Sequence, residues 1–381
     1  MSETPSSSSS PRIVPEAELL GKRGLLATPS MTVPKRTPPT LYDPWAWAKP
    51  VRLSGWLERQ QFHPVLLAFL VPVLAFMLYQ VVGAVAVAAM VIPGAIAGAQ
   101  DGVAPTSGEL MAQFTERADL LLIGNSIGQF VGFGFLVFLI ILLHTRQRAQ
   151  FAYVRRPDTL GMLLSVVALF AVLPFNTWLA GVNEALPIPE SIRAFDQSQM
   201  EMVEAVLGNL EISVGLALVL VALTPALCEE YLFRGYMQRQ LERRVPVWAM
   251  LLLVGLVFGL YHLRLTQALP LSFLGAYLAF AVWATGSLWT GVLLHLLNNG
   301  LAVLLMDYAK RNPDSQVAAL EEATMPWLGA LASFAIFVAV AWLMLQRRRR
   351  LVGDAVLVEA RDPDLDAQVT QMEGPRSGQL G

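Results

Sequence analysis

Charged residues are scarce in this 381-residue chain, at 15% of the total, whereas a soluble globular protein carries about 25%. The 27 basic and 29 acidic residues nearly balance, which excludes a broadly basic nucleic-acid-binding protein. The single cysteine, Cys228, excludes a disulfide scaffold and any cysteine-rich metal site, and we expect it to be a buried apolar thiol. Hydrophobic residues make up 55% of the chain, and its mean hydropathy is +0.52. This composition predicts an integral membrane protein.

The apolar stretches predict an all-α fold with about eight transmembrane helices, because a bilayer core requires about 20 apolar residues per helix. The segments that qualify are 64–92, 118–143, 159–181, 212–232, 246–262, 269–286, 288–306 and 326–345. Residues 265–306 contain no Asp, Glu, Lys or Arg. That run is too long for one span, so we place a break at Gly286 and Ser287. In the second span, Gly124, Gly128 and Gly132 predict close packing against another helix.

The loops between these segments alternate in charge. The loops after the second and fourth spans are rich in arginine, and Arg347 to Arg350 follow the last span, whereas the loops after the first and third spans are acidic. Because positive residues favour the cytoplasmic side, we expect a multi-pass protein of the cell membrane with both termini cytoplasmic. His63 and His144 lie at the expected membrane edges, and we interpret both as interfacial residues.

Composition also divides the chain into five parts. The central part holds the ionisable residues discussed below. The expected parts are a disordered Ser/Pro-rich N-terminal tail (1–44), an interfacial segment with helices 1–3 (45–204), a core of helices 4–7 (205–306), a final transmembrane helix (307–350) and a disordered C-terminal tail (351–381).

Ionisable residues inside transmembrane helices are costly and are therefore candidates for function. Those that lie deep in the expected spans, together with one carboxamide, are Glu229, Glu230, Arg234, His262, His295 and Asn299. Glu230 and Arg234 are four residues apart on one helix, a spacing that favours a structural ion pair. Glu229 points in a different direction and is left free for chemistry.

The spacing of these residues allows them to meet. Glu230 and His262 lie at similar distances from the turn before Pro246, so an antiparallel hairpin would bring them to the same depth. His295 and Asn299 share one helix face. His295 follows Ser287 by only eight residues, so either the link before it dips into the membrane or the preceding helix is short and tilted.

Several chemistries fit such a group. A carboxylate beside apolar walls suits a general base acting on water, and imidazole and carboxamide groups can donate hydrogen bonds to an oxyanion. Glu229, His262 and His295 are equally suitable as zinc ligands. A membrane transporter that uses the buried charges as a proton relay, or a catalytically silent scaffold, are the non-enzymatic alternatives.

Three short motifs in this region resemble a known family. Glu-Glu-x-x-x-Arg occurs at 229–234, Phe-x-x-x-His at 258–262 and His-x-x-x-Asn at 295–299. In this order the motifs resemble those of the CAAX prenyl protease and bacteriocin-processing (CPBP, or Abi) intramembrane proteases, which include the type II CAAX endopeptidases. The resemblance covers about 205–306, which we therefore interpret as a CPBP-like catalytic core.

This resemblance implies an intramembrane endopeptidase with a catalytic cavity inside the membrane. It implies that Glu229 activates water with His262, that His295 and Asn299 stabilise the oxyanion, and that Glu230 and Arg234 support them. The implied substrate is a membrane-associated protein or peptide, prenylated or bacteriocin-like, with no role for nucleic acid. We favour a mechanism that requires no cofactor, because an asparagine suits an oxyanion hole better than a zinc shell, and zinc is the alternative.

Overall fold

The computed structural model describes residues 40–41, 51–98, 106, 117–198, 213–315 and 325–359. These residues are predominantly helical, which confirms an all-α membrane protein. Apart from Thr40 and Leu41, the expected N-terminal tail lies outside the described residues. Residues 360–381 of the expected C-terminal tail also lie outside them. Residues 351–359, where we expected that tail to begin, are helical and continue the last helix.

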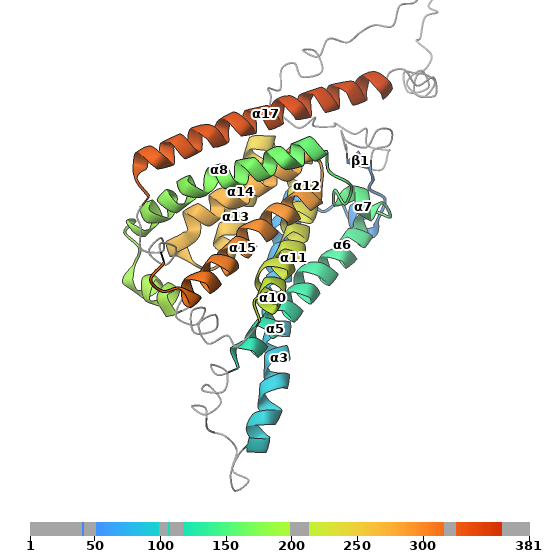
Figure 1. Cartoon of the computed structure of the whole chain (residues 1–381). Helices are drawn as coiled ribbons and strands as arrows, with labels where there is room; N and C mark the ends of the chain where they lie inside the picture. The colour runs from blue at the N-terminus through green and yellow to red at the C-terminus, as the bar shows by residue number, and fades with distance from the viewer. Residues whose placement is uncertain are drawn as a thin grey trace, which may run out of the picture.

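The first described residues form a short antiparallel ladder, and long helices follow it, several of them continuous through π-helical turns (Figure 1). The elements are β1 (Thr40–Leu41), β2 (Val51–Arg52), α2 (Trp56–Arg59), α3 (Pro64–Gly98), α5 (Ala118–Gln129), η2 (Phe130–Phe135), α6 (Leu136–His144), α7 (Arg148–Phe151), α8 (Thr159–Glu184), α10 (Val214–Ala217), η3 (Leu218–Leu223), α11 (Thr224–Leu232), η4 (Phe233–Met237), α12 (Gln238–Leu241), α13 (Val247–Tyr261), η5 (Leu265–Gln267), α14 (Ala268–Thr285), α15 (Leu288–Arg311) and α17 (Trp327–Glu359).

Seven helices within the described ranges are long and apolar enough to cross a membrane. They are Pro64–Gly94, Asp119–His144, Thr159–Glu184, Val214–Leu241, Leu265–Thr285, Leu288–Arg311 and Trp327–Leu351. The predicted span at 246–262 forms α13, whose 15 residues are fewer than the roughly 20 that a spanning helix requires. The count of eight spans is therefore not confirmed, although each predicted segment contains a helix.

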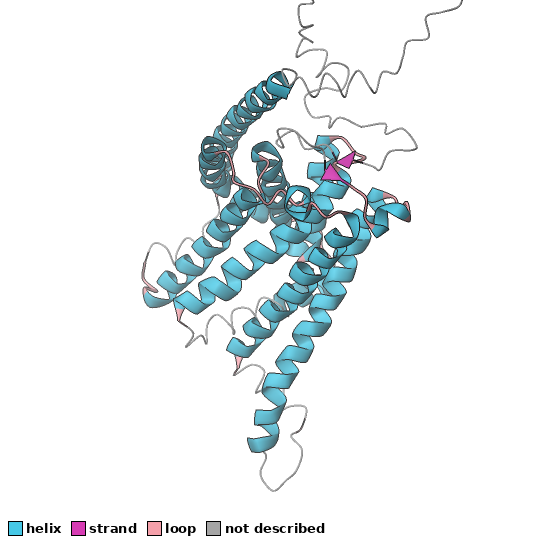
Figure 2. Ribbon diagram, turned by 90° about the vertical axis from the view of Figure 1, so that its right-hand side faces the viewer, coloured by secondary structure: helices cyan, strands magenta, loops and turns pink. Residues whose placement is uncertain are grey.

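Close helix packing at glycines holds one side of the bundle together. A Cβ added at Gly128 would lie 2.5 Å from the backbone oxygen of Tyr79 on α3, and one added at Gly124 would lie 2.2 Å from a Val87 methyl group. Only residues without a side chain permit this approach, so the predicted role of the glycine stripe is confirmed. Beyond this contact, α3 extends past the other helices, as both ribbon views show (Figures 1 and 2).

The other side of the bundle is built on two helix pairs. In the first pair, α17 lies along α8, with α14 also packed on α8 (Figure 1). In the second pair, α13 packs against α14, where a Cβ at Gly255 would lie 2.5 Å from the Ser272 carbonyl oxygen. Both α13 and α15 pack against α14, and the two histidines of the site lie on α15 and directly after α13.

The link between α14 and α15 is buried in the protein. Gly286 ends α14 in the left-handed conformation, with φ of 63°, which glycine adopts without steric cost. The Leu288 amide donates to the Tyr153 carbonyl oxygen at 2.9 Å, and the Ser287 hydroxyl donates to the Arg155 carbonyl oxygen at 2.6 Å. The predicted break is confirmed, and the segment around 153–155 covers it.

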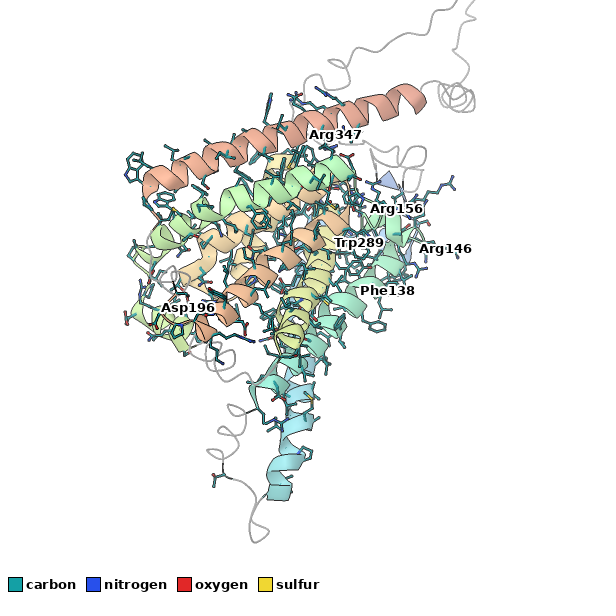
Figure 3. The ribbon with its side chains drawn as sticks, in the orientation of Figure 1. Phe138, Arg146, Arg156, Asp196, Trp289 and Arg347 are labelled. Atoms are coloured by element: carbon teal, nitrogen blue, oxygen red, sulfur yellow. The ribbon has the colours of Figure 1, made fainter. Side chains whose placement is uncertain are left out.

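The loop charges separate in space. Figure 3 shows Arg146, Arg156 and Arg347 toward the upper right of the molecule and Asp196 toward the lower left. Alternating basic and acidic loops require this separation. The side of the membrane on which each end lies stays a prediction.

His144 is buried within the protein, where the candidate span Asp119–His144 ends, and its interfacial position stays a prediction. Its Nδ1 lies 2.6 Å from Glu58 Oε1, and its Nε2 lies 3.1 Å from the Tyr236 hydroxyl. The segment around α2 folds over the end of α6 and removes the ring from water. Burial by itself raises the pKa of Glu58, but hydrogen bonds from His144 and Arg243 outweigh it and hold that pKa below its ordinary value.

Candidate active site

The site is organised around α11, which carries both glutamates of the first motif. This helix lies between two π-helical turns, η3 before it and η4 after it. Such turns widen the helix locally, release backbone groups from the regular α-helical pattern and occur frequently at functional sites. Because successive residues of a helix point about 100° apart, Glu229 and Glu230 enter different surroundings.

Glu230 is fully buried and paired with Arg234. The Arg234 Nη1 donates to Glu230 Oε1 at 2.7 Å, and both side chains are 0% exposed. The second guanidinium nitrogen donates to the Gly275 carbonyl oxygen on α14, also at 2.7 Å. The predicted ion pair is therefore confirmed, and it also ties the fourth span to α14.

His295, on α15, is attached to the same carboxylate oxygen. Its Nδ1 lies 2.9 Å from Glu230 Oε1. An ionised carboxylate only accepts hydrogen bonds, so Nδ1 carries the hydrogen and the tautomer is fixed. The remaining nitrogen, Nε2, accepts a hydrogen bond when the ring is neutral and donates one when the ring is protonated.

His262, directly after α13, is oriented in a similar way by its own helix. Its Nδ1 lies 2.8 Å from the Phe258 carbonyl oxygen, one turn earlier. A carbonyl oxygen also only accepts, so Nδ1 again carries the hydrogen. In the neutral ring, Nε2 keeps its lone pair, which is the form required to accept a hydrogen bond from water.

The Phe258 ring lies between the two histidines. Its centroid is 4.9 Å from that of His262 and 5.9 Å from that of His295. The Arg234 guanidinium lies 4.6 Å from the same centroid, a cation–π contact. A Cβ at Gly275 would lie 2.8 Å from the ring, so glycine at that position makes room for it. Phe258 therefore fixes the spacing of the histidines and covers the buried cation.

Glu229 is half-buried, and its Oε2 is buried with no hydrogen-bond partner among the described residues. Its charge interacts with Tyr79, Tyr261 and Arg234. Tyr261 directly precedes His262, so the carboxylate lies on the side of α11 that faces the end of α13. Glu230 Oε2 likewise has no partner among these residues. Glu230 Oε1, however, is held by Arg234 and His295, whereas Glu229 forms no ion pair with any described residue.

Asn299 lies one turn after His295 on α15. Its Nδ2 donates to the Val221 carbonyl oxygen at 3.2 Å, and its Oδ1 accepts from Asn298 at 3.1 Å. Val221 lies in η3, and its carbonyl oxygen orients the side-chain amide of Asn299. One of the two Asn299 N–H groups is thus available for another acceptor.

A comparison with family models finds a match to the part of the chain that holds this arrangement. Residues 211–301 match the Rce1-like type II CAAX prenyl endopeptidase family. The matched segment contains all three motifs, which confirms the resemblance predicted from them. No curated protein and no solved structure gives a match to the chain. The Rce1-like segment spans α10 through the first half of α15, so every residue of the site described above except Tyr79 lies within it.

A zinc site does not follow from the side chains of this segment. Among the described residues, no group of three His, Cys, Asp or Glu side chains is arranged to hold a metal ion. The three side chains considered as zinc ligands do not form such a group. They are Glu229, His262 and His295.

Sequence reasoning gave no role to several residues in or beside the Rce1-like segment. Phe258 is the first residue of its motif, and the i,i+4 spacing to His262 was the signal for its position. Tyr79 lies in an apolar span without any motif. Asn125 and Gln129 are polar residues four apart in the second span. This spacing could have indicated a shared polar face next to the glycine stripe.

Proposed function

We propose that the protein is an intramembrane endopeptidase of the CAAX type. It hydrolyses a peptide bond near the C-terminus of a membrane-associated protein or peptide. The observation that carries this proposal is the division of labour between two adjacent glutamates within the Rce1-like segment. Glu230 is held by Arg234 and His295 through its Oε1, while Glu229 has no ion-pair partner among the described residues and keeps a buried oxygen without a hydrogen bond.

Glu229 acts as the general base in this mechanism. A water molecule donates one hydrogen bond to Glu229 and the other to Nε2 of His262, which orients its oxygen toward the carbonyl carbon of the substrate. As the C–O bond forms, the water proton moves to Glu229. When the C–N bond breaks, Glu229 returns this proton to the leaving amine. The products are a carboxylate and a free amine.

His295 and Asn299 stabilise the oxyanion of the tetrahedral intermediate. Asn299 donates from the N–H group that is not used by Val221. His295 donates from Nε2, and because Nδ1 already carries a hydrogen for Glu230, this requires the protonated ring. Glu230 Oε1 holds Nδ1 of His295 at 2.9 Å. Glu230 and Arg234 are thus positioning residues.

The substrate class follows from the family of the matched segment. C-a-a-X motifs are sites of cysteine prenylation, so the first substrate to test is a fluorescent peptide with a farnesylated cysteine four residues from its C-terminus. The same peptide without the lipid, and a bacteriocin-like apolar peptide, are compared with it.

The test uses the full chain reconstituted in liposomes. Wild type is expected to cleave at least one of these peptides, while Glu229→Gln loses about 10²-fold to 10⁴-fold in rate, the usual contribution of a general base. Glu184→Gln, at the exposed end of α8, is the matched control and retains wild-type activity. Equal cleavage by wild type and Glu229→Gln would overturn the assignment of the base.

We also propose that both termini face the cytoplasm of a cell-membrane protein. The single native cysteine is buried, so cysteines introduced near either end give a clear signal with an impermeant thiol reagent. Labelling of intact cells at either terminus would contradict this orientation.

A further inference from the structure

Three polar side chains of α5 lie outside the segment matched by the family model. They are Asn125, Ser126 and Gln129. Ser126 and Gln129 are each only 5% exposed, yet Ser126 Oγ and Gln129 Oε1 have no hydrogen-bond partner among the described residues. A buried polar atom without a partner costs free energy. Their retention in an otherwise apolar transmembrane helix indicates a ligand.

The carboxamides face the same region as the aromatic side chains next to the site. Asn125, Gln129 and Phe133 follow one another at intervals of four residues, so they share a face of the helix. The Phe133 ring centroid lies 4.9 Å from that of Tyr79 and 5.5 Å from that of Tyr261. α5 and η2 also contact α11. The polar face of α5 is therefore directed toward the region where α3, α13 and α11 meet.

Tyr79 connects this face to Glu229. Its hydroxyl group donates to Asn125 Oδ1 at 2.5 Å, and its ring is close enough to Glu229 to interact with that charge. Because Asn125 Oδ1 is occupied, the residue offers only its Nδ2 donor, which has no partner among the described residues. Gln129 offers an acceptor, Oε1, and also a donor. The face thus presents unsatisfied groups of both kinds next to the general base.

We propose that Asn125 and Gln129 form a subsite that hydrogen-bonds the backbone of an extended substrate peptide beside Glu229. Residues four apart on a helix are separated by about 6 Å along its axis, and alternate residues of an extended chain by about 6.6 Å. The two carboxamides therefore match successive backbone groups on one edge of the peptide. This inference rests on the proposed function, since it places the scissile bond at the base.

The chemistry of the groups favours a peptide backbone over other ligands. Neutral carboxamides pair with both N–H and C=O groups, and burying them with a peptide brings no charge into the membrane. A terminal carboxylate would instead be met by a cation such as arginine. Backbone contacts are independent of side-chain identity, so the subsite sets the register of the substrate and leaves its sequence to other contacts.

The experiment measures peptide binding separately from cleavage. The probe is the farnesylated fluorescent peptide described above, together with a series in which each backbone amide in turn is replaced by an ester, which removes one N–H donor. Binding is measured by fluorescence anisotropy in nanodiscs, with Glu229→Gln as background to prevent turnover. Gln129→Met and Asn125→Leu remove the carboxamides at similar volume. Ile127→Met, at a lipid-facing position of the same helix, is the matched control.

We expect one ester position to weaken binding about fivefold to tenfold when Gln129 is present, the effect of one hydrogen bond. Gln129→Met weakens binding of the all-amide peptide by a similar factor and abolishes the ester effect at that position, which identifies the pair. Asn125→Leu weakens binding and leaves that ester effect intact. Ile127→Met changes neither.

Two results would overturn the subsite. One is that no ester replacement weakens peptide binding to the protein with native Gln129. This result can be obtained without any mutation in α5. The other is binding by Gln129→Met and Asn125→Leu that equals the Ile127→Met control. If binding follows the expected pattern but the protein with native Glu229 cleaves no peptide, the subsite stands and the proposed function fails.

Discussion

Nδ1 of His295 lies 2.9 Å from Oε1 of Glu230, which joins α15 to α11 across 65 residues of sequence. The same oxygen accepts a hydrogen bond from Arg234 at 2.7 Å. One carboxylate oxygen therefore neutralises a buried cation and also sets the tautomer of a histidine on another helix. This double use is the reason that the proposed mechanism assigns the base to Glu229 and a positioning role to Glu230.

Glu230→Gln is expected to destabilise the protein, and Glu229→Gln is not. The first change leaves the fully buried Arg234 without its counter-ion, which costs about 3–5 kcal/mol. The second removes a charge that no described residue pairs with directly. Thermal unfolding in detergent measures both. Equal losses of stability would show that the two carboxylates share one structural role.

Gly291→Ala is expected to disturb the site through the contact of the new Cβ with Glu230. A Cβ at this position would lie 2.5 Å from Glu230 Oε2 and 2.7 Å from a Val282 methyl group. Such overpacking costs about 1–3 kcal/mol and shifts the carboxylate that holds His295, so peptide cleavage falls as well.

Gly300→Ala on the same helix is the matched control for this change. Its Cβ would meet atoms no closer than 3.6 Å, and alanine favours helix more than glycine does by about 1 kcal/mol. Stability and cleavage therefore stay at or above the wild-type level. Loss of activity in Gly300→Ala equal to that in Gly291→Ala would contradict the argument from contact with Glu230.

Asp158 gives a pH-dependent contribution to stability. Its carboxylate caps α8 through the Gly161 amide at 2.8 Å and pairs with Arg347 at 2.8 and 2.9 Å. The hydrogen bond from Arg347 is the main reason that the pKa of Asp158 lies below its ordinary value, with burial opposing and the amide of Gly161 assisting. A lowered carboxyl pKa stabilises the fold fully above about pH 4, and this contribution is lost as pH falls through the folded pKa.

Asp158→Asn is therefore expected to cost about 0.5–1 kcal/mol at neutral pH, a value reduced for solvent screening of a partly exposed pair. The difference from wild type shrinks below about pH 4. Thermal unfolding between pH 7 and pH 3 measures it. Asp307→Asn, which breaks the more exposed pair with Arg311, is the control and changes little. A difference for Asp158→Asn that is constant with pH would contradict the sign of this linkage.

Cleavage is expected to survive removal of metal ions. The mechanism uses Glu229 as a base and hydrogen-bond donors for the oxyanion, and the described residues contain no cluster of three metal-ligating side chains. The protein is treated with chelator, dialysed and assayed, and its metal content is measured by mass spectrometry. Activity that disappears on chelation and returns with Zn²⁺ would favour the zinc mechanism instead.

Local patterns in the sequence predicted the parts of the molecule that depend on near neighbours. Apolar runs located each helix, because a bilayer requires long apolar segments. The i,i+4 spacing predicted the Glu230–Arg234 pair, and the small residues at Gly124 and Gly128 predicted the contact with α3. Gly286 predicted the break between α14 and α15, because few other residues adopt its backbone conformation.

Contacts between distant segments were not predictable in this way. The burial of His144 depends on a segment more than 80 residues earlier in the chain folding over α6. The length of α13 depends on where His262 ends the helix, and hydropathy does not mark that point. The polar face of α5 became visible only when Tyr79 and Phe133 showed which direction it faces.

The sequence by itself determined that this protein lies in a membrane as an α-helical bundle, and it predicted which of the rare polar residues are candidates for its chemistry. Hydropathy and short motifs suffice for this, since both are local properties of the chain. Only the tertiary structure decided which glutamate holds His295 and which has no ion-pair partner among the described residues. The choice depends on the direction in which α11 presents successive side chains to α14 and α15, and that direction is set by the packing of helices far apart in the sequence.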